Sequence, residues 1–149
     1  MKLFPAERFA NDRPTRLLRC VLAVLASGFI TIFVIATQLS PDSQGFGTHQ
    51  QLGLPPCTFL QLTGVKCPHC GMTTSFSHLV RGQFVGSLSA NPGGLVLSSM
   101  MVLGIPLLLT VSLTGRWVMT YDPMKWIMFG GMGYVVFVML WWFGQLMVS

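Results

Sequence analysis

Three long apolar runs dominate the chain, and polar or charged segments separate them. The runs cover residues 20–39, 93–113 and 126–148, and none contains a charged residue. Each reaches the roughly 20 residues that a helix needs to cross the hydrocarbon core of a bilayer. Because backbone groups in lipid must be bonded within their own segment, each run is predicted to be helical, with Pro106 tolerated as a kink in the second.

The pattern predicts an all-α integral membrane protein with a single membrane domain over residues 1–149. The expected order is a basic lead-in at 1–16, spans at 17–39, 92–114 and 124–148, an outer loop at 40–91, and a short amphipathic helix at 71–81 inside that loop. The composition agrees, with 52% hydrophobic and 9% charged residues, against about 25% charged in soluble domains. A secretory signal peptide is the alternative for the first run, but the run is longer than the roughly 7–15 residues of such a segment.

The distribution of positive charge predicts the orientation of the spans. Two basic residues occupy the loop at 40–91, and the others flank the first span or lie between the second and third spans: Lys66 and Arg81 against Lys2, Arg8, Arg13, Arg16, Arg19, Arg116 and Lys125. The positive-inside rule therefore places the N-terminus in the cytoplasm and the loop outside, as in a multi-pass protein of a bacterial inner membrane. The net charge of +5 suits anionic headgroups. No aromatic and basic platform indicates a nucleic-acid partner.

A short helix is expected to follow the loop, because apolar residues recur there at helical spacing. The apolar stripe comprises Met72, Phe76, Leu79 and Val80, and the polar side comprises Thr73, Thr74, Ser75 and Ser77. Gly82 is placed to end this helix. The Asn91-Pro92 pair leads into the second span, with the proline suited to a first helical turn.

Candidate chemistry is confined to the loop. Three of the four cysteines and all three histidines lie there: Cys57, Cys67, Cys70, His49, His69 and His78. Cys67-Pro68-His69-Cys70 spaces two thiols as in disulfide oxidoreductases, and its place before a helix predicts a lowered thiol pKa. The same tetrapeptide, CPHC, is the active-site motif of thioredoxin-like oxidases of the bacterial envelope, but the fold around it differs. Cys20, inside the first span, is predicted to be a small buried hydrophobe.

Three interpretations of the loop cysteines remain open from the residues alone. The thiols could stabilise the loop by packing, or by a disulfide between Cys70 and either Cys67 or Cys57, since an outer loop is oxidising. They could bind zinc as a Cys3His site, with His49, His69 or His78 as the fourth ligand. They could also exchange disulfides, with Cys57 resolving one thiol of the pair.

The chain resembles the domain of unknown function 2752 family of small bacterial membrane proteins over about residues 48–113. The residues that carry the resemblance are Cys57, Thr63-Gly64, Cys67-Pro68-x-Cys70-Gly71-x-Thr73, Leu79, Gly82 and Asn91-Pro92. Many members carry arginine directly after the motif threonine, where this chain has Thr74. The resemblance groups the cysteines with these neighbours, of which Gly71 would permit an unusual backbone angle and Thr73 would bond to helix-start amides.

The sequence thus favours a non-enzymatic membrane protein, such as an accessory subunit of a membrane complex, with its loop as a structural module. The alternative is a thiol-disulfide exchange or zinc-binding activity centred on Cys67 and Cys70. The few polar groups inside the spans argue against a transporter that acts alone.

Overall fold

The computed structural model describes the backbone of residues 13–117 and 123–148 and the side chains of residues 13–117 and 127–147. Every regular element in these ranges is helical. Most of the predicted lead-in, residues 1–12, lies outside the described part of the chain.

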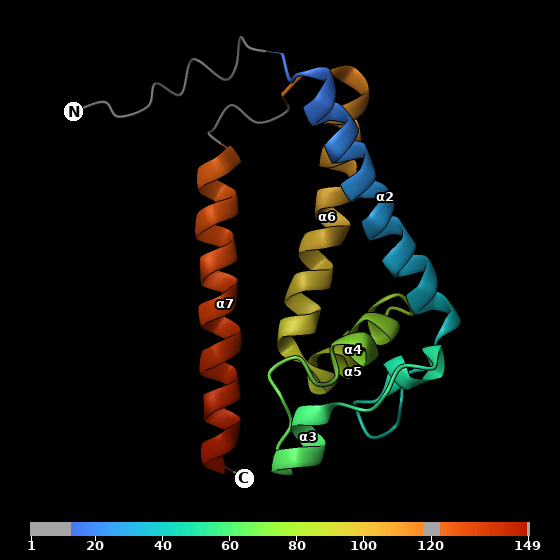
Figure 1. Ribbon diagram of the computed structural model, residues 1–149, viewed down its shortest axis with the longest axis vertical. Coiled ribbons are helices and arrows are strands. Elements are labelled where there is room, and N and C mark those ends of the chain that lie inside the picture. The colour runs from blue at the N-terminus through green and yellow to red at the C-terminus, as the bar shows by residue number, and fades with distance from the viewer. Residues whose placement is uncertain (1–12, 118–122, 149) are drawn as a thin grey trace, which may run out of the picture. The chain divides into compact units, whose positions relative to one another are not determined.

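Three long helices carry the apolar runs (Figure 1). They are α2 at Arg16–Gln38, α6 at Pro92–Thr114 and α7 at Pro123–Val148. Each is long and apolar enough to cross a membrane, as predicted. Pro92 is the first residue of α6, where its missing N–H breaks no helical bond, and Pro106 lies inside the same helix. The all-α membrane architecture expected from the sequence is confirmed.

Four short helices fold the segment between α2 and α6. They are the 3-10 helix η1 at Thr48–Leu52, α3 at Thr58–Thr63, α4 at Met72–Leu79 and α5 at Phe84–Ala90. Of these, only α4 was predicted, because elements of five to seven residues are too short to display a period. Gly53 and Gly64, both in the left-handed conformation, end η1 and α3.

The chain divides into two compact units, each described here by itself. The first unit comprises the described part of Met1–Thr31 together with Met101–Met132. The second unit comprises Ile32–Met100 and Gly133–Ser149. All loop cysteines and all histidines therefore lie in the second unit.

In the first unit, Arg19 joins α2 to the end of α6. Its Nε donates to the Ser112 carbonyl at 2.7 Å and its Nη2 to the Leu113 carbonyl at 2.9 Å. These carbonyls belong to the last turn of α6, where no helical N–H remains to bond them. Arg19, predicted only as a flanking charge, thus caps a neighbouring helix.

The second unit is built around α4 and α5, which pack against each other (Figure 1). The polar side of α4 is buried rather than solvated, because its hydroxyls find partners. Thr74 Oγ1 lies 2.8 Å from Thr48 Oγ1, and Ser75 Oγ lies 2.7 Å from Ser87 Oγ. Ser77 Oγ donates to the Leu39 carbonyl at the end of α2. Hydrogen bonds of small side chains therefore hold α4 in the centre of this unit.

Glycines at the start of α6 allow its close packing. A Cβ on Gly94 would come within 2.7 Å of Ser75 Cβ on α4, and one on Gly93 within 2.8 Å of Val138 Cγ2 on α7. The start of α6 is consequently fixed against α4 and α7 within the second unit. This contact sets the position of Asn91, which immediately precedes α6.

Candidate thiol site

Three thiols converge in the second unit. The Sγ atoms of Cys57 and Cys67 lie 3.6 Å apart, and those of Cys67 and Cys70 lie 3.0 Å apart. All three Sγ atoms lie within 4.8 Å of one another. Each of these residues is partly buried and each is a free thiol. The disulfides considered above, between Cys70 and either Cys67 or Cys57, stay predictions.

Two local structures present the thiols. Cys57 occupies the N-cap position of α3, directly before Thr58. Cys67 and Cys70 are joined by a tight turn, in which the Cys70 N–H donates to the Cys67 carbonyl at 3.0 Å. The turn brings the two side chains of the Cys-x-x-Cys spacing to one side. Sequence spacing predicted this pair, whereas the approach of Cys57 depends on the fold of residues 58–66.

Asn91 holds the turn from outside the motif. Its Nδ2 donates to the Pro68 carbonyl at 3.1 Å and to the Cys70 carbonyl at 2.9 Å. Its Oδ1 accepts from the Gly94 N–H at 2.9 Å. The side chain is fully buried, so all three bonds form in a poorly solvated place where unpaired partners would be costly. One amide therefore ties the cysteine turn to the first turn of α6.

Gly71 fits the turn tightly against two other segments. Its φ of 87° is in the left-handed region, and a Cβ there would lie 2.5 Å from the Ala90 oxygen and 2.6 Å from the Gly45 oxygen. Backbone atoms cannot move aside as a flexible side chain would. Both the angle and the close approach require glycine at the residue that follows Cys70.

Thr73 was expected to bond the N–H groups at the start of a helix, and it does not do so. It makes no side-chain hydrogen bond within the described residues, and the N-cap of α4 is Gly71, which has no side chain to cap the helix. The adjacent Thr74 is the buried threonine, through its bond to Thr48. Thr74 thus occupies an interior position in this chain.

The pKa values of two thiols move in opposite directions. The backbone N–H of Leu60, in the first turn of α3, lowers the pKa of the Cys57 thiol, with smaller contributions from the Cys70 and Cys67 side chains, while burial opposes the shift. Burial raises the pKa of the Cys70 thiol to about 12, and its hydrogen bonds with Cys67 and Cys57 act in the same direction. The site therefore combines an easily ionised thiol with one that retains its proton.

The predicted effect of a helix start on the Cys-x-x-Cys motif is wrong for Cys70. The helix that follows is α4, but Cys70 precedes its N-cap residue and is partly buried, so desolvation outweighs any helix field. The thiol whose pKa is lowered by helix-start amides is Cys57, on α3. This shift could not be predicted from the sequence, because α3 spans only six residues and shows no helical period.

The histidines lie outside the thiol cluster. Within the described residues, the group of convergent metal-binding side chains consists of Cys57, Cys67 and Cys70. The His49 Nε2 lies 3.2 Å from the Pro55 carbonyl, and the His78 Nδ1 lies 2.7 Å from the Gln83 Oε1. Of the predicted Cys3His zinc site, the fold thus brings together the three cysteines but no histidine among the described residues.

Aromatic side chains surround the residue that precedes Cys67. Trp142 Nε1, on α7, donates to the Lys66 carbonyl at 2.7 Å, and its ring packs edge-on against Phe59 of α3. The Lys66 ammonium lies 4.6 Å from the centre of the Phe46 ring. No local sequence pattern indicates these partners, because Trp142 is 76 residues away from Lys66 in the chain.

Cys20 is exposed on α2, so the prediction of a buried thiol is wrong. Burial in a membrane helix depends on protein neighbours, and among the described residues too few lie beside Cys20 to cover it. It belongs to the first unit and provides a natural control for experiments on the cluster.

The thiol spacing can accommodate a thiophilic metal ion. Zinc–sulfur bonds of about 2.3 Å in a tetrahedron separate the sulfurs by about 3.8 Å. The Cys57–Cys67 separation of 3.6 Å is close to this value, and the Cys67–Cys70 pair would need to open by less than ~1 Å. Both changes are within reach of side-chain rotation.

A comparison with protein families finds a match for part of the chain. No curated protein and no solved structure matches the chain. The matched segment, residues 57–111, includes the three clustered cysteines, Asn91-Pro92 and most of α6. It confirms the family resemblance that the sequence predicts. Residues 57–111 of the chain match the family of proteins of unknown function DUF2752.

Proposed function

We propose that this chain is a non-enzymatic, multi-pass membrane protein whose loop binds a thiophilic metal ion, such as Zn²⁺, through Cys57, Cys67 and Cys70. The observation that carries the proposal is the convergence of three Sγ atoms within 4.8 Å. Thiolates are the soft ligands that zinc and similar ions prefer. Bound metal would also stabilise the short helices around the loop, since metal binding favours the folded state.

The surroundings of the cluster support ligation. Cys57 has a lowered pKa and loses its proton readily, whereas Cys70 would release its proton to the metal, because ligation requires the thiolate. Asn91 and Gly71 fix the turn that presents two of the three thiols. A rigid presentation of ligands reduces the ordering that binding must supply.

A fourth ligand would come from outside the described residues of this chain, as water or as a side chain of a partner. This arrangement suits an accessory subunit of a membrane complex, in which the metal bridges two proteins. The positive-inside rule supports an inner-membrane orientation with the N-terminus in the cytoplasm and the loop outside.

Metal analysis of the full-length protein, purified in detergent without chelators, tests the proposal. We expect about one equivalent of bound metal, and loss of that metal in each of Cys57→Ser, Cys67→Ser and Cys70→Ser. Cys20→Ser is the matched control and should retain the metal. Cobalt substitution should give sulfur-to-metal charge-transfer bands that disappear in the cluster variants. Less than about a tenth of an equivalent in the wild-type protein would overturn the proposal.

Thiol-disulfide exchange is the second candidate, favoured by the 3.0 Å separation of the Cys67 and Cys70 Sγ atoms. In this reaction a thiolate attacks a disulfide of a partner, a mixed disulfide forms, and the second thiol displaces the partner's thiol. The Cys67–Cys70 pair becomes a disulfide and the partner gains two electrons. Cys67→Ser or Cys70→Ser, each combined with Cys57→Ser so that no neighbouring thiol resolves the intermediate, would then trap a mixed disulfide that reductant releases, and Cys20→Ser would not.

A further inference from the structure

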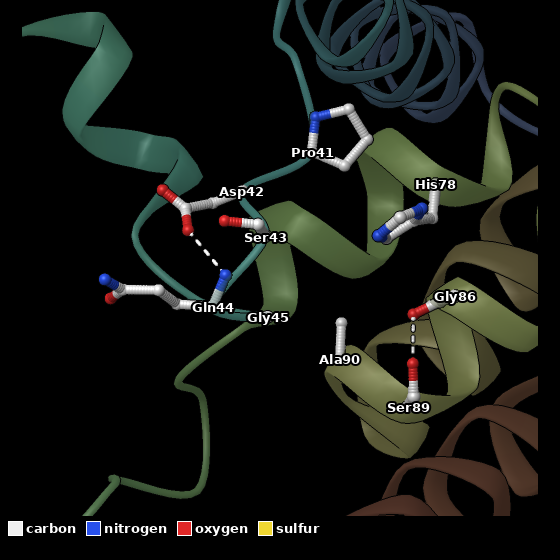
Figure 2. Close-up of a pocket in the computed structure, with 9 residues that line it drawn as sticks. All are labelled: Pro41, Asp42, Ser43, Gln44, Gly45, His78, Gly86, Ser89 and Ala90. Carbon is white, nitrogen blue, oxygen red and sulfur yellow. Dashed lines mark hydrogen bonds between the residues drawn. The ribbon is translucent and has the colours of Figure 1, made fainter.

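A cavity of about 390 Å³ lies in the second unit, in the range typical of small-molecule sites (Figure 2). Three segments form it: the residues that follow α2, the end of α4, and α5. The lining residues are Pro41, Asp42, Ser43, Gln44, Gly45, His78, Gly86, Ser89 and Ala90. None of the three cysteines lines it.

His78 is oriented toward this cavity. Figure 2 shows its imidazole extending from α4 toward the space between Ser43 and Ala90. Its Nδ1 lies 2.7 Å from the Gln83 Oε1, an atom that can only accept. The Nδ1 therefore carries a proton, and in the neutral imidazole the Nε2 presents a lone pair that no described residue bonds. Gln83 thus fixes the tautomer that makes His78 an acceptor.

Gly86 determines where the ring lies. A Cβ at this position would come within 2.6 Å of the His78 Nδ1 and 2.9 Å of its Cε1. Any larger residue would push the imidazole away from α5. The position of the His78 ring, and the direction in which its Nε2 points, therefore depend on glycine at residue 86.

The remaining polar groups of the lining are the hydroxyls of Ser43 and Ser89, the amide of Gln44 and the carboxylate of Asp42. The Ser89 hydroxyl donates its proton to the Gly86 carbonyl at 3.0 Å, so its oxygen is left to accept. Asp42 is the single acidic residue between residues 13 and 121 of the sequence, and it borders the cavity. Its Oδ1 accepts from the Gln44 N–H at 2.8 Å, and its carboxylate points away from His78 (Figure 2), so it would act on a ligand through its charge and not through a direct bond. No lysine or arginine lines the cavity. The lining therefore selects a ligand that is positively charged and donates hydrogen bonds.

We propose that this cavity binds a primary ammonium group, which donates a hydrogen bond to the His78 Nε2 and is attracted by the Asp42 carboxylate. The site begins three residues after the end of α2, one of the helices able to span the membrane. An ethanolamine lipid headgroup and a free small amine share the required chemistry. The proposal is independent of metal binding by the cysteines.

The test observes the imidazole directly in the full-length protein. The protein, labelled with ¹⁵N in its histidines, is placed in phosphatidylcholine nanodiscs and titrated with ethanolamine while the ring nitrogen resonances are recorded. We expect a saturable shift of the His78 Nε2 and none at His69, which is exposed. Choline has the same charge but no N–H donor and should produce no comparable shift. A second preparation containing phosphatidylethanolamine distinguishes the sources: a shift without added amine identifies the headgroup as the ligand.

Two variants separate the site from general folding effects. Gln83→Leu leaves the ring in place but removes the acceptor that fixes its tautomer, and should weaken ethanolamine binding about tenfold. Gly86→Ala should displace the ring and abolish the shift. Equal responses to ethanolamine and choline, or no saturable response to either the amine or the lipid, would overturn the proposal. A His78 response to Zn²⁺ but not to amines would also overturn it, because the cavity would then be a metal site.

Discussion

The two units differ in what they bury. In the second unit the fully buried side chains are polar, namely Asn91, Thr48, Thr74, Ser75, Ser77, Ser87 and Ser98. In the described part of the first unit, Ser112 is the single buried polar residue, beside Ala26, Met101 and Val111. Long helices satisfy their own backbone, whereas the short helices and turns of the second unit leave carbonyls and N–H groups that side chains must bond.

Each unit contains an arginine that bonds carbonyls at the end of a helix, and the two arginines differ in how many segments they connect. Arg19 bonds the last carbonyls of α6 in the first unit. Arg81 bonds the Ala36 and Thr37 carbonyls at the end of α2 in the second unit, and also the carbonyl of Ser77. Arg81 thus connects three backbone groups of two helices. We infer that polar contacts determine the structure of the second unit, and that apolar helix surfaces suited to lipid dominate the first.

The largest predicted effect concerns thiol reactivity in the second unit, where burial raises the pKa of Cys70. At pH 8 a pKa of about 12 lowers the thiolate fraction of Cys70 about a thousandfold relative to an ordinary thiol. Cys57, with a lowered pKa, should ionise at lower pH. Alkylation of the metal-free protein at increasing pH, read by peptide mass, should modify Cys57 long before Cys70. Similar rates at both residues would contradict the electrostatic asymmetry of the cluster.

Replacing Asn91 tests the polar interior of the second unit. Asn91→Ala leaves two carbonyls and one N–H buried without partners, and should lower the free energy of unfolding by about 4 kcal/mol. Thermal unfolding in detergent measures this loss. Asn91→Asp keeps the acceptor for the Gly94 N–H and should be less damaging than alanine at a pH where the carboxyl is protonated.

The matched change in the first unit is Thr110→Ala. The Thr110 hydroxyl, which this change removes, donates to the Pro106 carbonyl within α6. That carbonyl is exposed to its surroundings, so we expect less than about 0.5 kcal/mol. Equal losses for Asn91→Ala and Thr110→Ala would remove the distinction between the units.

A pair of glycines tests backbone packing in the same way. Gly71→Ala forces a Cβ against two carbonyl oxygens at a positive φ, and should destabilise the protein by about 3 kcal/mol. Gly104→Ala, in the first unit, places its Cβ where no atom lies within 4 Å. It should be neutral or stabilising by up to about 1 kcal/mol. Denaturation of the two variants under the same conditions provides the comparison.

Lysine replacements of the two capping arginines should have the smallest effects. Arg81→Lys should reduce stability by about 1.5 kcal/mol and Arg19→Lys by about 1 kcal/mol, since one ammonium cannot reproduce the planar fork of donors. Unfolding midpoints of both variants measure the difference. A greater loss for Arg19→Lys would mean that the first unit depends more on its polar contacts than its composition indicates.

Much of the architecture could be predicted from the sequence because its signals are long. Spans of 20 or more apolar residues and the presence of α4 follow from patterns over many residues. The start of α6 follows from the Asn91-Pro92 pair, since proline suits a first helical turn. The short helices η1, α3 and α5 could not be predicted, since each is stabilised by contacts with distant segments rather than by its own periodicity.

The sequence by itself determined the helical membrane class, the resemblance to DUF2752 and the pairing of Cys67 with Cys70, which have two residues between them. Only the tertiary structure decided that Cys57 joins them, that the histidines lie elsewhere, and that Asn91 holds the cysteine turn. The physical reason is distance along the chain: spacing fixes which side chains meet within one turn, whereas the Asn91 amide reaches Pro68 across 23 residues. Thiols that look alike in the sequence then acquire opposite pKa shifts, because the Leu60 N–H lowers the pKa of Cys57 whereas burial raises the pKa of Cys70.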